Sequence, residues 1–192
     1  MLNKGKVFAI GAAKTATTSL SLALKKLSFK HKPYDLALSN KVYVSGDYET
    51  IFCEVEKYNS FDDGPWNRGE FYKLLDQRFP NSKFILTIRE PADWVESHEK
   101  HFSSNSNVLR IGPELWINDY DKQQNIDLYQ KRNEQVLEYL KNRPGQLLVI
   151  NICNDEGWEK LCSFLGLSVP DIPFPLANVT QKHQKMSAIK KY

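Results

Sequence analysis

The segment from Val7 to Leu24, VFAIGAAKTATTSLSLAL, most constrains how this chain can fold. It begins as an apolar strand, breaks at a glycine and a polar stretch, and continues with leucines spaced as on one face of a helix. A strand, a tight loop and a helix form the first unit of an α/β fold, in which ligands bind beyond the carboxyl ends of the strands. The sequence therefore predicts a ligand site directly after this first strand.

The loop is rich in groups that bind anions. Unsatisfied N–H groups at a helix N-terminus favour an anion, and Lys14 adds a positive charge. Four hydroxyls lie within five residues, on Thr15, Thr17, Thr18 and Ser19. Capping a helix needs only one such residue, so the pattern favours an anion site. An ATP or GTP loop of the form GxxxxGK[ST] is disfavoured, because Lys14 comes three residues after Gly11 and no second glycine directly precedes it.

Strands alternate with helices along the rest of the chain. Apolar runs predict strands at residues 6–10, 83–88 and 146–152, with a shorter one ending near Phe61. Helical spacing predicts helices that include residues 20–27, 51–58, 71–75, 126–140 and 158–165. We therefore expect a three-layer α/β fold, with a mainly parallel central sheet flanked by helices. Residues 1–192 should form a single domain with an irregular, proline-rich tail from about residue 170.

Composition excludes several classes of protein. A net charge of +3 is too small to indicate nucleic acid or membrane binding by itself. The three cysteines, Cys53, Cys153 and Cys162, form no metal-binding or disulfide pattern and suit a reducing compartment. No apolar run approaches the roughly 20 residues that span a bilayer, and no signal peptide is evident, so we expect a cytoplasmic protein.

A second anion-binding group follows the strand at residues 83–88. Arg89 falls at the carboxyl end of this strand, and Glu90-Pro91 is a suitable helix start. Ser97 lies two turns into that helix. A guanidinium can hold a phosphate through two parallel N–H bonds, to which a hydroxyl adds another donor. A surface ion pair of Arg89 with Glu90 or Asp93 is the alternative interpretation.

Both segments resemble the sulfotransferases that use 3′-phosphoadenosine-5′-phosphosulfate (PAPS). GAAKTATTSL is similar to their 5′-phosphosulfate loop, and Arg89 with Ser97 is similar to their 3′-phosphate motif. FDDGPW, FPNSKFILTIREPADW and GWEKLCSFLGLSVPDIPFPLAN also resemble segments of short sulfotransferases without a membrane anchor. The resemblance implies a P-loop NTPase-like fold, PAPS as donor, 3′-phosphoadenosine-5′-phosphate (PAP) as product and no metal. It implies donor contacts from Gly11, Lys14, Thr15, Ala16, Thr17, Thr18, Ser19, Arg89 and Ser97.

One loop position departs from the family pattern. Ala16 stands where the family often has glycine, and alanine tolerates positive φ less well. Lys14 is the candidate for stabilising the oxygen that bridges sulfate and 5′-phosphate, where negative charge grows as the bond breaks. Its role is therefore both catalytic and donor-binding.

The catalytic base is expected in NSFDDGPW. Family members use a histidine or an acidic residue in this region, and the DGPW match favours Asp63 over Asp62. The pKa of Asp63 would have to be raised by burial or by Asp62. Aspartate before Gly-Pro is also ordinary turn chemistry. His98 and His101, three residues apart on a helix, could supply another base or half of a metal site, but no third metal ligand is evident.

The acceptor cannot be read from the motifs. In the tail, Lys182 or Lys185 could close over the 3′-phosphate, as basic loops of the family do. We expect a small-molecule acceptor, such as a sugar, a phenol or another alcohol or amine. Residues 30–60 and 103–125 are expected to shape the pocket that binds it. The alternatives are a kinase or other phosphotransferase on the same fold, and a nucleotide-binding protein without catalytic activity.

Overall fold

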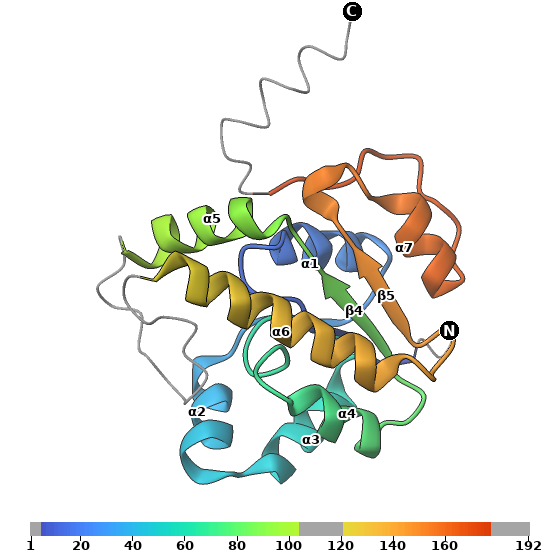
Figure 1. The fold of residues 1–192 in the computed structure, drawn as a ribbon. Coiled ribbons are helices and arrows are strands. Elements are labelled where there is room, and N and C mark those ends of the chain that lie inside the picture. Colours follow the sequence, from blue (N-terminus) through green and yellow to red (C-terminus); the bar gives the residue numbers. More distant parts are fainter. Residues whose placement is uncertain (1–4, 104–120, 178–192) are drawn as a thin grey trace, which may run out of the picture.

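The computed structural model describes residues 5–103 and 121–177 (Figure 1). Its centre is a five-stranded sheet in the order β2-β3-β1-β4-β5, and all neighbouring strands are parallel. The strands are β1 (Val7–Ala9), β2 (His31–Lys32), β3 (Ser60–Phe61), β4 (Lys83–Thr87) and β5 (Leu147–Ile150). Because the strands are parallel, the segments that follow them emerge at one edge of the sheet. The predicted α/β fold with a parallel sheet is confirmed.

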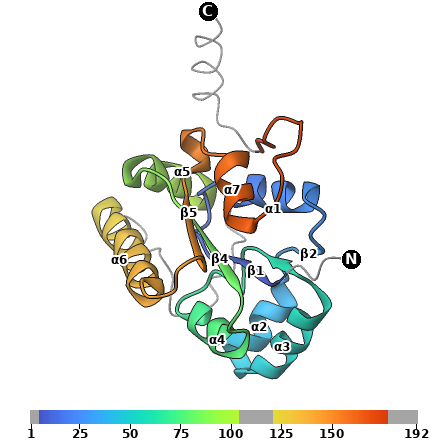
Figure 2. The same cartoon turned by 90° about the vertical axis from the view of Figure 1, so that its right-hand side faces the viewer.

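Helices cover both faces of this sheet (Figure 2). They are α1 (Thr17–Lys26), α2 (Leu36–Ser45), α3 (Tyr48–Lys57), α4 (Phe71–Arg78), α5 (Pro91–Ser103), α6 (Lys122–Leu140) and α7 (Trp158–Leu165), with a short 3-10 turn, η1 (Ile152–Asn154). No helix within residues 5–103 or 121–177 has both the length and the apolar character needed to cross a lipid bilayer.

Each strand supplies both faces because successive side chains point to opposite sides. Val7 and Ala9 of β1 pack with α1 and α7, where Leu24 and Leu161 are fully buried. Phe8 points to the other face, where α3, α4 and α6 pack. Burying large apolar side chains on both faces explains why the strands read as continuous apolar runs.

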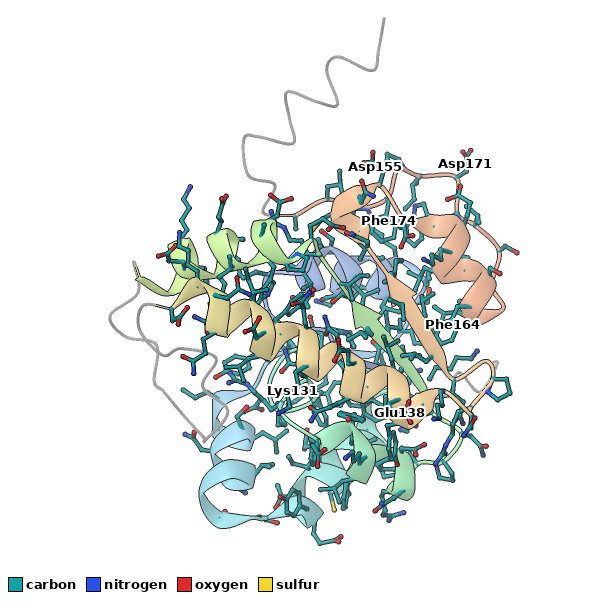
Figure 3. The ribbon with its side chains drawn as sticks, in the orientation of Figure 1. Lys131, Glu138, Asp155, Phe164, Asp171 and Phe174 are labelled. Carbon is teal, nitrogen blue, oxygen red and sulfur yellow. The ribbon has the colours of Figure 1, made fainter. Side chains whose placement is uncertain are left out.

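The segment after α7 packs back onto that helix. The indole Nε1 of Trp158 donates a hydrogen bond to the carbonyl of Ile172 at 2.7 Å. The ring of Phe174, a residue labelled in Figure 3, meets the Trp158 ring edge-on, with centroids 4.9 Å apart. Residues 170–177 contain no helix or strand, and these two contacts hold them against the domain.

Three elements were not predicted from the sequence, namely β2, α2 and the short turn η1. β2 has two residues, which is too short for a recognisable alternation. α2 follows it, capped by the Asp35 carboxylate, which accepts from the Leu38 N–H at 3.0 Å. The other strands and helices lie where the sequence predicted them, and the strands are one to three residues shorter than the apolar runs.

Gly11 is required where the chain leaves β1. A Cβ atom there would lie 2.6 Å from the carbonyl oxygen and 2.7 Å from the nitrogen of Thr87, and would overlap Thr87 Oγ1. Thr87 ends β4, which pairs directly with β1, so neither backbone can move apart without breaking the ladder. The loop therefore crosses the end of β4 at a separation that only glycine permits.

We predict that Gly11→Ala lowers the free energy of unfolding by about 3 kcal/mol or more, because the new methyl group overlaps backbone atoms. Urea unfolding of the purified variant measures the loss. Gly5→Ala, before β1, is the matched control: its Cβ would meet only the Asn81 carbonyl, at 3.7 Å. That variant should stay within about 0.5 kcal/mol of the parent. Equal stabilities for the two variants would contradict the packing argument.

Candidate anion-binding and catalytic site

The loop after β1 is held through its carbonyl groups. Side chains from four other segments and one from the loop donate to five consecutive carbonyls. In order from Ile10 to Lys14, these carbonyls accept from Arg132 (2.6 Å), Asn67 (3.2 Å), Thr15 (2.6 Å), Trp94 (2.9 Å) and Arg89 (3.4 Å). In a trans peptide the following N–H points the opposite way. The bonds therefore turn the loop N–H groups away from the protein side chains that hold it.

The loop conformation is that of an anion-binding concavity. Lys14 and Ala16 both have left-handed backbone angles, with φ of 72° and 67°. Alternation of left-handed and other residues gathers successive N–H groups toward one point. The first bond of α1 runs from the Leu20 N–H to the Ala16 carbonyl, so the N–H groups of residues 17–19 precede the helical ladder. Ala16 thus adopts the positive φ for which glycine is better suited.

Two cations approach each other at this loop. Burial, followed by the positive charge of Arg89, lowers the pKa of Lys14. The Arg89 guanidinium bonds the Lys14 carbonyl through one terminal nitrogen, while its Nε is buried without an acceptor among the described residues. A buried N–H without a partner is costly, and an anion between the two side chains would satisfy it and relieve their repulsion.

The four hydroxyls of the loop do not all face the same way. Thr15 is fully buried; its hydroxyl bonds the Ala12 carbonyl and lies 2.6 Å from Thr87 Oγ1. The Ser19 hydroxyl, also buried, accepts from the N–H of Ala177 at 3.0 Å. Thr17 is half-buried and Thr18 exposed. The hydroxyls of Thr17 and Thr18 remain open to a ligand, whereas Thr15 and Ser19 can offer their N–H groups.

Aromatic side chains support the second cationic segment. The Tyr129 hydroxyl accepts from the Arg89 N–H at 2.9 Å and is 3.1 Å from the Arg89 carbonyl, to which it donates. Its ring stacks on Trp94, with centroids 4.3 Å apart and 10° between the planes. Trp94 in turn bonds the loop after β1, so α5 and α6 support both strand ends together. Ser97 lies half-buried on α5.

Asp62 and Asp63 follow β3, which is the neighbour of β1 on the side away from β4. Asp62 is buried and its Oδ1 lies 3.0 Å from His31 Nε2. Burial and then the charge of Asp62 raise the pKa of Asp63, against the opposing effects of the Gly64 N–H and of Arg68. The direction of this shift is the one required of Asp63 as a base, whereas Asp62 is hydrogen-bonded to His31. The role of base stays a prediction.

The positive charge of Lys14 contributes to lowering the pKa of both histidines of α5, His98 and His101. Burial, then His101 and then Lys14 lower the pKa of His98 to about 4, and its ring lies 4.8 Å from that of Trp94. Burial and Lys14 also lower the pKa of His101, while Asp63 raises it. Groups of three or more potential metal-ligating side chains do not occur within the described residues.

The predicted tail residues Lys182 and Lys185 lie outside the described residues, as does most of the segment 103–125. The structure does place the start of that tail. The N–H of Ala177 donates to the Ser19 hydroxyl in the first turn of α1, so the last described residue lies beside the loop after β1.

The sequence did not identify the residues whose side chains donate to the loop carbonyls. Arg132 is only 6% exposed, yet it occupies the buried stripe of α6 with Tyr129, Val136 and Leu140. A charged residue at a position of the apolar stripe was the signal that could have identified it. Trp94 lies within a recognised motif and Asn67 directly follows one, but nothing in their spacing shows that they bond a distant carbonyl. His31 lies in the strand that was not predicted.

Together the fold and the loop define an α/β protein with Lys14 and Arg89 beside one loop at the carboxyl edge of its sheet. A family model for the sulfotransferase domain matches residues 6–117 and 108–183. The chain therefore belongs to the sulfotransferase domain family. It is also 24% identical over 218 aligned positions to a protein named Ava biosynthesis cluster protein M, from Aspergillus versicolor, covering 88% of this chain and 79% of that protein.

We predict that Asp63→Asn raises the melting temperature at neutral pH. The raised pKa of Asp63 means that its ionised form destabilises the fold, and asparagine removes that charge. Asparagine also tolerates the φ of 59° and can still accept from the Gly64 N–H. The gain should shrink as the pH falls through the folded-state pKa and vanish below about 3.9, where the unfolded aspartate is protonated too.

Asp155→Asn is the matched control for this thermal experiment. Asp155 has the same left-handed backbone, with φ of 62°, but is exposed. Scanning calorimetry of both variants between pH 3 and pH 8 should show a pH-dependent gain only for the Asp63 variant. An Asp63→Asn protein that melts below its parent at neutral pH would contradict the prediction.

Proposed function

We propose that this protein transfers a sulfuryl group from PAPS to a hydroxyl or amine of a small-molecule acceptor. The observation that carries the proposal is the convergence at one sheet edge of the loop with Lys14, a strand-end Arg89 and a half-buried carboxylate, Asp63. The loop with Lys14 and the Arg89 side chain could bind the two anionic groups of a nucleotide. Asp63 could act as the base. Membership of the sulfotransferase domain family supports the same reaction.

The 5′ end of the donor would occupy the loop after β1. The N–H groups of residues 17–19 and the hydroxyls of Thr17 and Thr18 are available to phosphate oxygens. Lys14 would stabilise the oxygen that bridges sulfur and phosphorus. Its lowered pKa indicates an ammonium group that is incompletely solvated. An anionic partner stabilises such a group more strongly than it would in water.

The 3′-phosphate would bind Arg89 and Ser97. Arg89 fits this role because its Nε is buried without an acceptor in the part of the chain that is described. The Tyr129 hydroxyl fixes the backbone of Arg89, which restricts where the guanidinium can reach. Lys182, which follows the anchored Ala177, is proposed to add a charge over the same phosphate.

In the proposed reaction Asp63 accepts the proton of the acceptor group. The acceptor atom forms a new bond to sulfur, and the bond from sulfur to the bridging oxygen breaks, leaving PAP. A carboxylate with a raised pKa is a stronger base than an ordinary aspartate. Asp62 is the weaker candidate because His31 binds it.

A small-molecule acceptor agrees with the surroundings of Asp63. The Tyr34 ring packs on Gly64, at 3.0 Å from where a Cβ would stand, and the Arg68 guanidinium influences both Tyr34 and Asp63. An exposed aromatic ring beside the base suits a sugar or a phenol. The printed name of the Aspergillus relative refers to a biosynthesis cluster, which supports a small molecule over a macromolecule.

Calorimetric titration with PAP, and separately with ATP and magnesium, tests the donor site. PAP should bind and ATP should bind weakly or not at all. Arg89→Ala should weaken PAP binding by about 1.5–3 kcal/mol, on the order of tenfold to a hundredfold, because it removes charged hydrogen bonds. Arg78→Ala, at the end of α4 and the opposite edge of the sheet, is the control and should leave the affinity unchanged. Preference for ATP, or an unchanged affinity in Arg89→Ala, would overturn the proposal.

Turnover of Asp63→Asn tests the base. With an acceptor from a panel of phenols and sugars, kcat should fall by about 10²–10⁴-fold, which is the usual contribution of a general base. PAP affinity should be unchanged because Asp63 is not a donor ligand. Asp62→Asn is the matched control and should retain more activity. Full activity in Asp63→Asn would move the role of the base to another residue.

A further inference from the structure

His31 forms a buried junction between three elements of the fold. Its Nδ1 lies 2.9 Å from Ser60 Oγ of β3, and its Nε2 lies 3.0 Å from Asp62 Oδ1 and 3.1 Å from Ser21 Oγ of α1. The His31 side chain is 1% exposed and that of Asp62 11%. The proposed reaction does not use this imidazole, although it bonds the residue next to the proposed base.

The bonding partners determine how the ring is protonated. An ionised carboxylate can only accept hydrogen bonds, so Nε2 must carry the proton that it shares with Asp62. A neutral ring then accepts from the Ser60 hydroxyl through Nδ1, whereas a charged ring donates to it. In both states Nε2–H points at Asp62, and the bonds to β3 and α1 prevent the ring from turning away.

Asp62 and Asp63 influence each other electrostatically. The charge of Asp62 is, after burial, the largest cause of the raised pKa of Asp63. The groups that face Asp63 from other segments are Arg68, which lowers its pKa, and Tyr34 and His101, whose own pKa values respond to it. Two neighbouring carboxylates in such a setting tend to share a proton unless one of them is held in the ionised form.

We propose that His31 is a positioning residue, whose Nε2–H binds the Asp62 carboxylate and so leaves Asp63 as the carboxylate that receives the acceptor proton. The inference rests on the proposed function for the role of Asp63, but the coupling of the three side chains can be measured without an acceptor. A histidine that only filled space would need no carboxylate at its Nε2. Here the hydrogen bond fixes the charge and the orientation of the residue beside the base.

The proposal predicts how the carboxylates titrate. Without the bond from His31, the pair should take up its first proton at a higher pH, because Asp62 loses the partner that favours its ionised form. In His31→Gln the ring that spans Ser60 and Asp62 is replaced by a flexible amide. The pH at which the pair takes up its first proton should then rise by about one unit.

Titration of the Asp62 and Asp63 side-chain carboxyl carbons by NMR, on the full-length chain labelled with ¹³C-aspartate, measures this shift. Ser21→Ala is the control: it removes the other partner of Nε2 without touching Asp62, and should leave both titrations in place. In an Asp62→Asn background, His31→Gln should no longer move the titration of Asp63. A His31→Gln protein that is folded and titrates like its parent would overturn the proposal, as would a shift of Asp63 that persists without Asp62.

PAP titration of the same samples distinguishes a failure of the proposed function from a failure of the role proposed for His31. If PAP does not bind the parent protein, the proposed function fails, and the NMR titration still decides whether His31 controls the pair. If PAP binds and the titration is unchanged in His31→Gln, only the present inference fails. Once an acceptor is found, the acidic limb of the kcat/KM profile should move up in pH with the NMR titration, which a purely structural role for His31 would not produce.

Discussion

The guanidinium of Arg132 binds the two halves of the site together. One of its nitrogens donates to the carbonyl of Ile10, where β1 ends, at 2.6 Å, and to the carbonyl of Asn67, just after Asp63, at 2.8 Å. The side chain comes from α6, on the far side of the anion-binding loop, and is almost fully buried. A charge removed from water in this way requires good hydrogen bonds, so the loop and the base segment are held at a fixed separation.

The same principle extends along the loop. Its carbonyls are bound by side chains, and under the proposed function the opposite N–H groups are oriented before a ligand binds. Donors fixed in advance stabilise charge without having to reorganise during a reaction. The strain of Lys14 and Ala16 in left-handed conformations is sustained by these bonds, and backbone strain of this kind is concentrated at functional sites.

The sequence predicted most of the fold and which strand ends carry polar and charged residues, but not how those residues are arranged. Strand ends located Gly11, Asp63 and Arg89, because side chains after parallel strands gather at one edge. It could not distinguish the hydroxyl of Thr15, which faces inward, from that of Thr17, since the loop follows no regular period. Nor could it find Arg132 or His31, because a hydrogen bond between residues far apart in the chain leaves no local pattern. β2 was missed for its length and α2 for its weak amphipathic pattern.

The strand order has a consequence for the direction of chemistry. Along the carboxyl edge, β3, β1 and β4 present Asp63, Lys14 and Arg89 in that spatial sequence. Under the proposed reaction, the acceptor enters from the β3 side and the nucleotide departs from the β4 side, with the transferred group passing over β1 between them. The topology of the sheet therefore gives the site a polarity: incoming and outgoing partners are kept apart by a whole strand and need not compete for the same space.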